Sequence, residues 1–179
     1  YVNCLYKSAA LSHRFQATMT TFAICRVGNL RLLEHCAPQL VWDPKSSLAA
    51  AEGGHTGCLE YAVRMKKSIH PNTTQEAAKY NQGNFLQRCV ELGVAWCPDT
   101  SLTAARHNHL ECVVLVHQLQ QFIHPSTSLE AAMSEDGNFA ILSFLFQNNL
   151  HWHPRTTYFA AMCGHLKTLQ WCAQHNTLW

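Results

Sequence analysis

The stretch His107-Asn108-His109-Leu110-Glu111-Cys112 contains the residue types that bind zinc. His109 and Cys112 are three residues apart, a spacing that places both on one face of a helix, and His55 and Cys58 repeat it. A structural zinc site needs four ligands. The same positions elsewhere in the chain hold Asn29/Leu32, Asn84/Gln87, Asn138/Ile141 and His165/Thr168. Because Leu and Ile cannot bind a metal, we interpret the His or Asn as a helix cap and the Cys as a small core residue.

The best remaining metal candidate is a group near the C-terminus, Cys163, His165, Cys172 and His175. Cys172 and His175 share a helix face, whereas Cys163 and His165 are expected in a turn. We interpret His151 and His153, which flank Trp152, as exposed loop residues. The favoured prediction is that the chain binds no metal, and a zinc-stapled repeat domain stays open as the alternative function.

Signatures of catalysis are missing from the chain. It has no Gly-rich phosphate loop, no G-x-S-x-G and no H-E-x-x-H, and its 11 carboxylates are dispersed. A Cys–His dyad assembled in space leaves no sequence pattern, so that possibility stays open. We predict no catalytic residue, no cofactor and no enzymatic activity.

The charge pattern argues against a nucleic-acid partner. The net charge is +2, and the one tight basic group is Arg64, Lys66 and Lys67. A nucleic-acid surface normally carries a larger basic patch. We therefore interpret these three residues as a solvated helix end, where cations also favour the C-terminal dipole.

A repeat organises the whole chain. Pro44, Pro71, Pro98 and Pro125 are spaced by 27 residues, and Pro154 follows after 29. Two residues before each proline stands a large apolar side chain: Trp42, Ile69, Trp96, Ile123 and Trp152. An Ala pair follows each proline at a fixed distance: Ala50-Ala51, Ala77-Ala78, Ala104-Ala105, Ala131-Ala132 and Ala160-Ala161, with Phe22-Ala23 one period earlier. A fixed period of this size indicates stacked repeats.

Each repeat is predicted to hold two helices. Ser46, Thr73, Thr100, Thr127 and Thr156 are expected to be N-caps of a short first helix that contains the Ala pair. Thr73/Glu76 and Thr127/Glu130 have capping-box spacing. A turn rich in His, Asn and Gly leads to a second helix with apolar residues at i, i+3 and i+4. The large residue before each proline is expected to fill the seam between neighbouring repeats.

The turns suggest a second-order pattern. Six residues separate the Ala pair from the cap in Ala23→Asn29, Ala78→Asn84 and Ala132→Asn138. Four residues separate them in Ala51→His55, Ala105→His109 and Ala161→His165. The alternation predicts protrusions on every second repeat along one edge.

The segments TSLTAARHNHLECVVL (100–115) and TTYFAAMCGHLKTLQW (156–171) resemble the ankyrin-repeat family, in which a Thr cap, an Ala pair and Gly-His-Leu-Glu recur. The likeness covers nearly the whole chain, but the period is 27 and the Thr-Pro-Leu-His motif is missing. The Trp-x-Pro junctions are similar to those of degenerate ankyrin-like arrays. The resemblance implies an all-α solenoid of stacked helix-turn-helix repeats that binds proteins as a scaffold and lacks the family's long β-hairpins.

We expect one repeat array over residues 1–179, cut from a longer one: a partial unit at 1–16, then units at about 17–43, 44–70, 71–97, 98–124, 125–153 and 154–179. Nine cysteines spaced on helix faces suggest reduced core thiols, and hence an intracellular reducing compartment such as the cytoplasm. No apolar run is long enough to span a membrane, and no signal peptide is expected.

Charged residues make up only 13 % of the chain, roughly half the usual share. We therefore expect a partner protein to cover part of the surface, as in a structural subunit of a larger assembly. A free adaptor that recruits a substrate protein is the second alternative. The predicted partner-binding residues are the variable ones at the turns: Arg26, Glu52, Lys79, Tyr80, Arg106, His107, Glu135, Asp136 and Met162. Tyr80, Arg106 and Met162 are the expected anchors.

Overall fold

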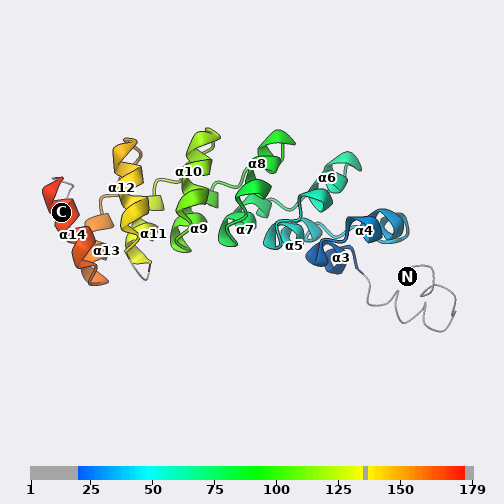
Figure 1. Ribbon diagram of the computed structural model, residues 1–179, viewed down its shortest axis with the longest axis horizontal. Coiled ribbons are helices and arrows are strands. Elements are labelled where there is room, and N and C mark those ends of the chain that lie inside the picture. Colours follow the sequence, from blue (N-terminus) through cyan, green and yellow to red (C-terminus); the bar gives the residue numbers. More distant parts are fainter. Residues whose placement is uncertain (1–19, 135–136, 176–179) are drawn as a thin grey trace.

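The computed structural model describes residues 20–134 and 137–175, which form six helix pairs in chain order (Figure 1). The first helices of the pairs are α3 (Thr21–Val27), α5 (Ser46–Glu52), α7 (Thr73–Lys79), α9 (Thr100–Arg106), α11 (Thr127–Met133) and α13 (Thr156–Met162). The second helices are α4 (Leu30–Cys36), α6 (Thr56–Arg64), α8 (Gly83–Glu91), α10 (Leu110–Gln118), α12 (Phe139–Gln147) and α14 (Leu166–Gln174). A short 3-10 helix, η1 (Ala37–Gln39), follows α4, and the described residues contain no strand.

The pairs stack side by side into an elongated array (Figure 1). First helices contact the first helices of neighbouring pairs from α3 to α13, and second helices do the same from α4 to α12. The predicted fold class, an all-α solenoid of stacked helix-turn-helix repeats, is confirmed. Within the described part of the chain, no helix combines the length and apolar character needed to cross a membrane.

The Ala pairs lie where the first helices meet. Ala51, Ala78, Ala105 and Ala132 are all fully buried, and this absence of larger side chains lets neighbouring backbones approach closely. Larger apolar residues of the second helices fill the adjoining space: Leu59, Phe85, Leu86, Val113 and Leu142. Burying one such side chain stabilises the fold by about 1.5–3 kcal/mol. Ala161, at the same position in the last described pair, is exposed.

The predicted N-cap role of the Ser and Thr residues is wrong. Ser46, Thr73, Thr100, Thr127 and Thr156 are the first residues inside their helices, and none of these helices has a side-chain cap at the preceding residue. The Thr73 hydroxyl donates to the carbonyl of His70 at 2.6 Å, and the Thr100 and Thr127 hydroxyls donate to Cys97 and His124 at 2.7 and 2.6 Å. These hydroxyls therefore hold the junction before the helix.

The same hydroxyls also join one repeat to the next. Ser101 Oγ and Thr127 Oγ1 are 3.1 Å apart, and the backbone N–H of His124 donates to Ser101 Oγ at 2.8 Å. Four more buried pairs join neighbouring repeats in the same way at 2.8–3.0 Å: Thr21–Ser46, Ser47–Thr73, Thr74–Thr100 and Ser128–Thr156. We call this row of five Ser/Thr pairs the hydroxyl ladder. It satisfies polar groups that stacking removes from water.

The predicted capping boxes do not form. Glu76 is bonded to Lys79 at 3.0 Å, and Glu130 is bonded to Arg106 at 2.9 Å. The Thr hydroxyls bond within the ladder, while Glu76 bonds a lysine of its own helix and Glu130 bonds an arginine of the preceding repeat.

The predicted alternation of long and short turns is also wrong. In all six described pairs a residue with positive φ is followed at once by the N-cap of the second helix: Gly28-Asn29, Gly54-His55, Asn81-Gln82, Asn108-His109, Gly137-Asn138 and Gly164-His165. In the third pair the cap is Gln82, not Asn84. In the first pair the buried small residue is Cys25, and Ala23 is exposed. Only the turn after α11 is longer among the described pairs.

The junctions before the prolines fill the seams between repeats, as predicted. Trp42, Ile69, Trp96, Ile123 and Trp152 are partly buried against the core, and Trp42 Nε1 donates to the carbonyl of Ser68 at 2.8 Å.

The residue between each large side chain and its proline has a local role. The Nδ1 atoms of His70, His124 and His153 each accept a hydrogen bond from the backbone N–H two residues on, at 3.0–3.2 Å. His151 is exposed as predicted, but His153 is half-buried and bonded.

Candidate functional site

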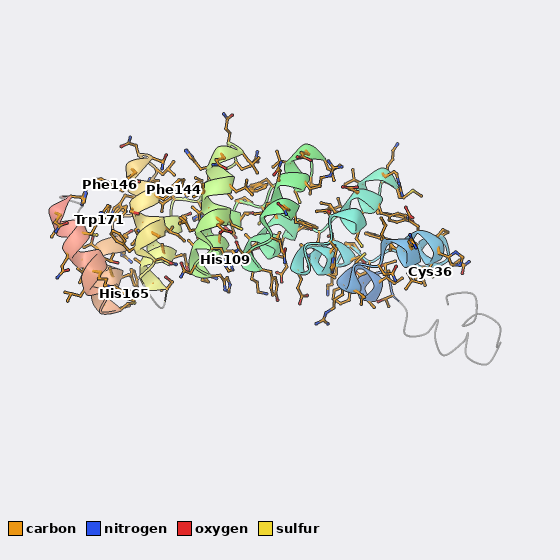
Figure 2. The ribbon with its side chains drawn as sticks, viewed as in Figure 1. Cys36, His109, Phe144, Phe146, His165 and Trp171 are labelled. Atoms are coloured by element: carbon orange, nitrogen blue, oxygen red, sulfur yellow. The ribbon has the colours of Figure 1, made fainter. Side chains whose placement is uncertain are left out.

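The predicted partner-binding residues gather along one edge of the array, where the first helices end and the turns begin. Glu52, Lys79, Arg106 and Met162 are the last residues of their helices, and Arg26 is the last but one of α3. Tyr80 and His107 follow directly in the turns. We call this strip the turn edge. Figure 2 shows His109 and His165, two caps of the same turns, along it. Glu135 and Asp136 lie outside the described residues.

Ion pairs occupy most of the charges on the turn edge. Arg106 makes a bidentate contact with Glu130, with both N–O distances at 2.9 Å, and this hydrogen bonding raises the pKa of Arg106. Lys79 is bonded to Glu76, which raises the pKa of Lys79. Arg26 and Glu52 are 4.0 Å apart. The four charged candidates that the structure describes, Arg26, Glu52, Lys79 and Arg106, therefore have partners within the array itself.

The aromatic and sulfur-containing candidates are more accessible. Tyr80 is 41 % exposed and Met162 is 60 % exposed. The Lys79 ammonium lies 4.8 Å from the centre of the Tyr80 ring. His107 stacks on His109 with ring centres 6.2 Å apart, and burial, with a smaller effect of the neighbouring His109, lowers the pKa of His107.

The histidines of the predicted His–Cys pairs bond to backbone of the preceding repeat. His109 Nε2 lies 3.0 Å from the carbonyl oxygen of Lys79, and His55 Nε2 lies 3.3 Å from that of Arg26. Gln82 takes the same position in the repeat between them, and its Nε2 donates to the carbonyl of Glu52 at 3.2 Å. These side chains satisfy carbonyls at the ends of first helices that have no partner within the helix.

The rings also restrict the turn they cover. A Cβ atom on Gly28 would collide with the ring of His55, and one on Gly137 would collide with the ring of His165. Glycine at these two positions therefore serves both the positive φ and the close approach of the next repeat.

The cysteines of these pairs are buried thiols. Cys112 Sγ is bonded to Asn81 Oδ1 at 3.2 Å, and burial raises the pKa of Cys112 to about 11. Burial raises the pKa of Cys89 to about 12. A hydrogen bond from Cys25 to Cys58, together with burial, raises the pKa of Cys25, and the same hydrogen bond lowers the pKa of Cys58. The thiols with a raised pKa, Cys25, Cys89 and Cys112, stay neutral and are poor nucleophiles and poor metal ligands.

No cluster with the makings of a metal site occurs in residues 20–134 and 137–175. Groups of three or more His, Cys, Asp or Glu side chains close enough to hold an ion are absent there. The C-terminal metal candidate of the sequence analysis is not assembled either. Cys163 is exposed on the turn, whereas Cys172 is fully buried on α14. His175 stacks on Trp171 with ring centres 4.3 Å apart.

The contacts between neighbouring second helices differ along the array. At its N-terminal half, ion pairs bridge neighbouring helices: Arg64 to Glu34 and Arg88 to Glu60, both at 2.7 Å. At the C-terminal half, rings take their place, with Phe146 edge-on to Trp171 at 5.0 Å (Figure 2). These aromatic contacts pack α12 against α14.

Two acidic residues that pair with cations of the turn edge were assigned another role from the sequence. Glu76 and Glu130 were placed in capping boxes, although they supply the carboxylates for Lys79 and Arg106. The three-residue spacing of Glu76 and Lys79 on one helix could have indicated the first pair. The Arg106–Glu130 pair joins different repeats and leaves no local signal.

No protein-family model matches the chain, and no curated protein matches it at a significant level.

Proposed function

We propose that this protein is a non-catalytic protein–protein interaction scaffold, built from ankyrin-like repeats, that serves as a structural subunit of a larger assembly. The observation that carries the proposal is that the His and Cys side chains suited to chemistry hold the repeats together. Along the array, His55 and His109 bond to the backbone of the preceding repeat, and Cys112 is buried. The side chains best suited to chemistry thus join one repeat to the next and leave an extended surface as the usable feature.

The exposed apolar residues support a protein partner. Val27, Val41, Phe122, Tyr158, Met162 and Leu166 are each more than half exposed in a chain with few charges. Apolar side chains on a surface of low charge are typical of contact regions between proteins. The anchors we propose on the turn edge are Tyr80 and Met162, while Arg106 contributes only if its pair with Glu130 opens.

The thiols support an intracellular, reducing location. Cys25 and Cys58 are free thiols in hydrogen-bond contact, and Cys89, Cys97 and Cys112 are free and buried. A structure that holds neighbouring cysteines reduced fits a compartment that keeps thiols reduced.

Affinity purification of the tagged protein from its source, followed by mass spectrometry and metal analysis of the same sample, tests the proposal. We expect a stoichiometric protein partner and no stoichiometric metal. A Tyr80→Ala/Met162→Ala variant should lose that partner, and Gln118→Ala/Gln147→Ala, at two exposed positions of second helices outside the turn edge, is the control. Zinc at one equivalent and no partner would overturn the proposal in favour of a metal-stapled domain.

A further inference from the structure

An open depression of about 310 Å³ lies between the C-terminal ends of α6 and α8, which are neighbours in the row of second helices (Figure 1). Its apolar wall includes Val63 and Ile69 from one repeat and Leu92 and Val94 from the next. The site is a seam between two repeats, on the side away from the turn edge. Its volume is at the small end of the range for ligand pockets, so it suits one or two side chains better than a large molecule.

Two lysines and a histidine, Lys66, Lys67 and His70, line this depression, and no carboxylate does. Among the described residues neither lysine makes an ion pair, whereas Arg64 beside them is paired with Glu34. Glu91, next to the wall residue Leu92, is bonded to Arg88 at 2.7 Å and to Gln87 at 3.1 Å. The two lysine charges are therefore uncompensated within the described part of the fold.

The backbone at Lys66 is unusual for its residue type. Lys66 has φ of 50°, in the left-handed region, two residues after the end of α6. The same position after the next three second helices holds Gly93, Gln120 and Asn149. Glycine and asparagine adopt this conformation at little cost, whereas a long side chain such as Lys66 or Gln120 gives up stability there. Glycine at residue 66 should therefore relieve the strain and remove the charge in one substitution.

The remaining lining group also presents a donor. Because His70 Nδ1 accepts the backbone N–H of Asn72 at 3.2 Å, the proton of the neutral ring is on Nε2. The depression thus combines an apolar wall with two ammonium groups and one N–H donor. This chemistry fits an apolar side chain that has carboxylates beside it.

We propose that the depression, the Lys66–Lys67 pocket, binds an acidic segment of a partner protein, with one apolar side chain against Val63, Ile69, Leu92 and Val94 and adjacent carboxylates on the two lysines. The inference rests on the proposed scaffold function and adds a second contact, in the row of second helices, to the one proposed on the turn edge. Charge complementarity selects the occupant. Two lysines match two or three carboxylates, and they are too few for a nucleic-acid backbone.

The test begins with a displayed library of random heptapeptides selected on the purified chain. We expect enrichment of peptides with a large apolar residue next to two or more Asp or Glu. The most enriched sequence is then made as a fluorescent peptide, and its affinity is measured by anisotropy. Raising the ionic strength from about 0.1 M to about 1 M should weaken binding, because the Debye length falls from ~10 Å to ~3 Å.

The diagnostic variant is Lys66→Gly/Lys67→Gln, which removes both charges and relaxes the backbone at residue 66. We expect it to fold at least as stably as the parent and to bind the peptide about tenfold more weakly, as losing two partly exposed charge contacts predicts. The control, Lys45→Gln/Lys167→Gln, removes the same charge elsewhere and should bind within about twofold, since exposed charges distant from a site act weakly.

Three results would overturn the proposal: no acidic–apolar motif in the selected peptides, equal binding by the diagnostic variant, or binding to phosphatidylserine vesicles in place of peptides. Peptides that bind the parent and the diagnostic variant equally would place the contact elsewhere and leave the scaffold function standing. The scaffold function fails on its own test, the absence of a stoichiometric partner in the affinity purification.

Discussion

The Ser and Thr side chains at the start of the first helices each serve two neighbours. Ser101 Oγ accepts from the His124 backbone and bonds Thr127, which in turn donates to the His124 carbonyl. A hydroxyl can do this because it is both a donor and an acceptor. Valine or alanine would fill similar space but would leave buried backbone groups unpaired, which explains why polar residues occupy fully buried positions.

Ser101→Ala should lower the free energy of unfolding by about 1–3 kcal/mol, because the His124 N–H loses its partner away from water. Urea unfolding measures the change. Ser143→Ala is the matched control, since the Ser143 hydroxyl only bonds back to Ala140 within its own helix and its removal should change stability by less than about 0.5 kcal/mol. Equal effects of the two substitutions would argue against the hydroxyl ladder.

Stability should fall as the pH rises above 9. Unfolded thiols ionise near a pKa of 9.0, whereas burial raises the pKa of Cys112 to about 11 and that of Cys89 to about 12. Between pH 9 and 11 the unfolded state therefore binds fewer protons than the folded state, and the two thiols together lower the free energy of unfolding by about 2.7 kcal/mol per pH unit.

Urea unfolding at a series of pH values measures this slope. The control is Cys89→Ala/Cys112→Ala, which is less stable throughout but should lose about 2.7 kcal/mol less per pH unit in that window. The same slope in both proteins would show that these thiols ionise equally readily in the folded and unfolded states.

The helices themselves are too short to be stable alone. The first helix of every described pair has seven residues, and α6, α8, α10, α12 and α14 have nine. Isolated helices shorter than about 12–15 residues are marginal in water. Each helix therefore depends on packing against its neighbours.

The Arg106–Glu130 pair joins α9 to α11 across the turn edge, with both N–O distances at 2.9 Å. A double-mutant cycle of Arg106→Ala and Glu130→Ala should give a coupling of about 0.2–1 kcal/mol, because Arg106 is mostly exposed and its charge is screened. The coupling should shrink at about 1 M salt. Arg155, which has no ion pair among the described residues, gives the control: Arg155→Ala with Glu130→Ala should show no coupling.

The exposure of equivalent residues depends on where their repeat lies in the array. Internal repeats have a neighbour on both sides, so Ala51, Ala78, Ala105 and Ala132 are sealed from solvent. In the last described pair Ala161 is exposed, together with Tyr158, Met162 and Leu166. The same alanine therefore contributes differently to stability at equivalent positions, because stability in such arrays comes from interfaces between nearest neighbours.

Ala105→Leu should destabilise the protein by about 1–3 kcal/mol, because the added methyl groups have to separate α9 from α11 in a close-packed seam. Ala161→Leu makes the same chemical change at an exposed position and should cost less than about 0.5 kcal/mol. Thermal unfolding of both variants beside the parent measures the difference. A similar loss in the two would contradict the described stacking.

The sequence by itself determined the helix pairs, their order and the all-α class, because these depend on periodic side-chain spacing that is local in the chain. It also placed the predicted contact residues on one edge, since equivalent positions of a regular repeat stack in register. What only the tertiary structure decided is which group each polar side chain bonds. Thr127 fits an N-cap locally but bonds across to Ser101, and Glu130 fits a capping box but bonds Arg106. Partners from a neighbouring repeat win because stacking brings them within reach and removes the competing water, and neither effect is visible in the order of residues.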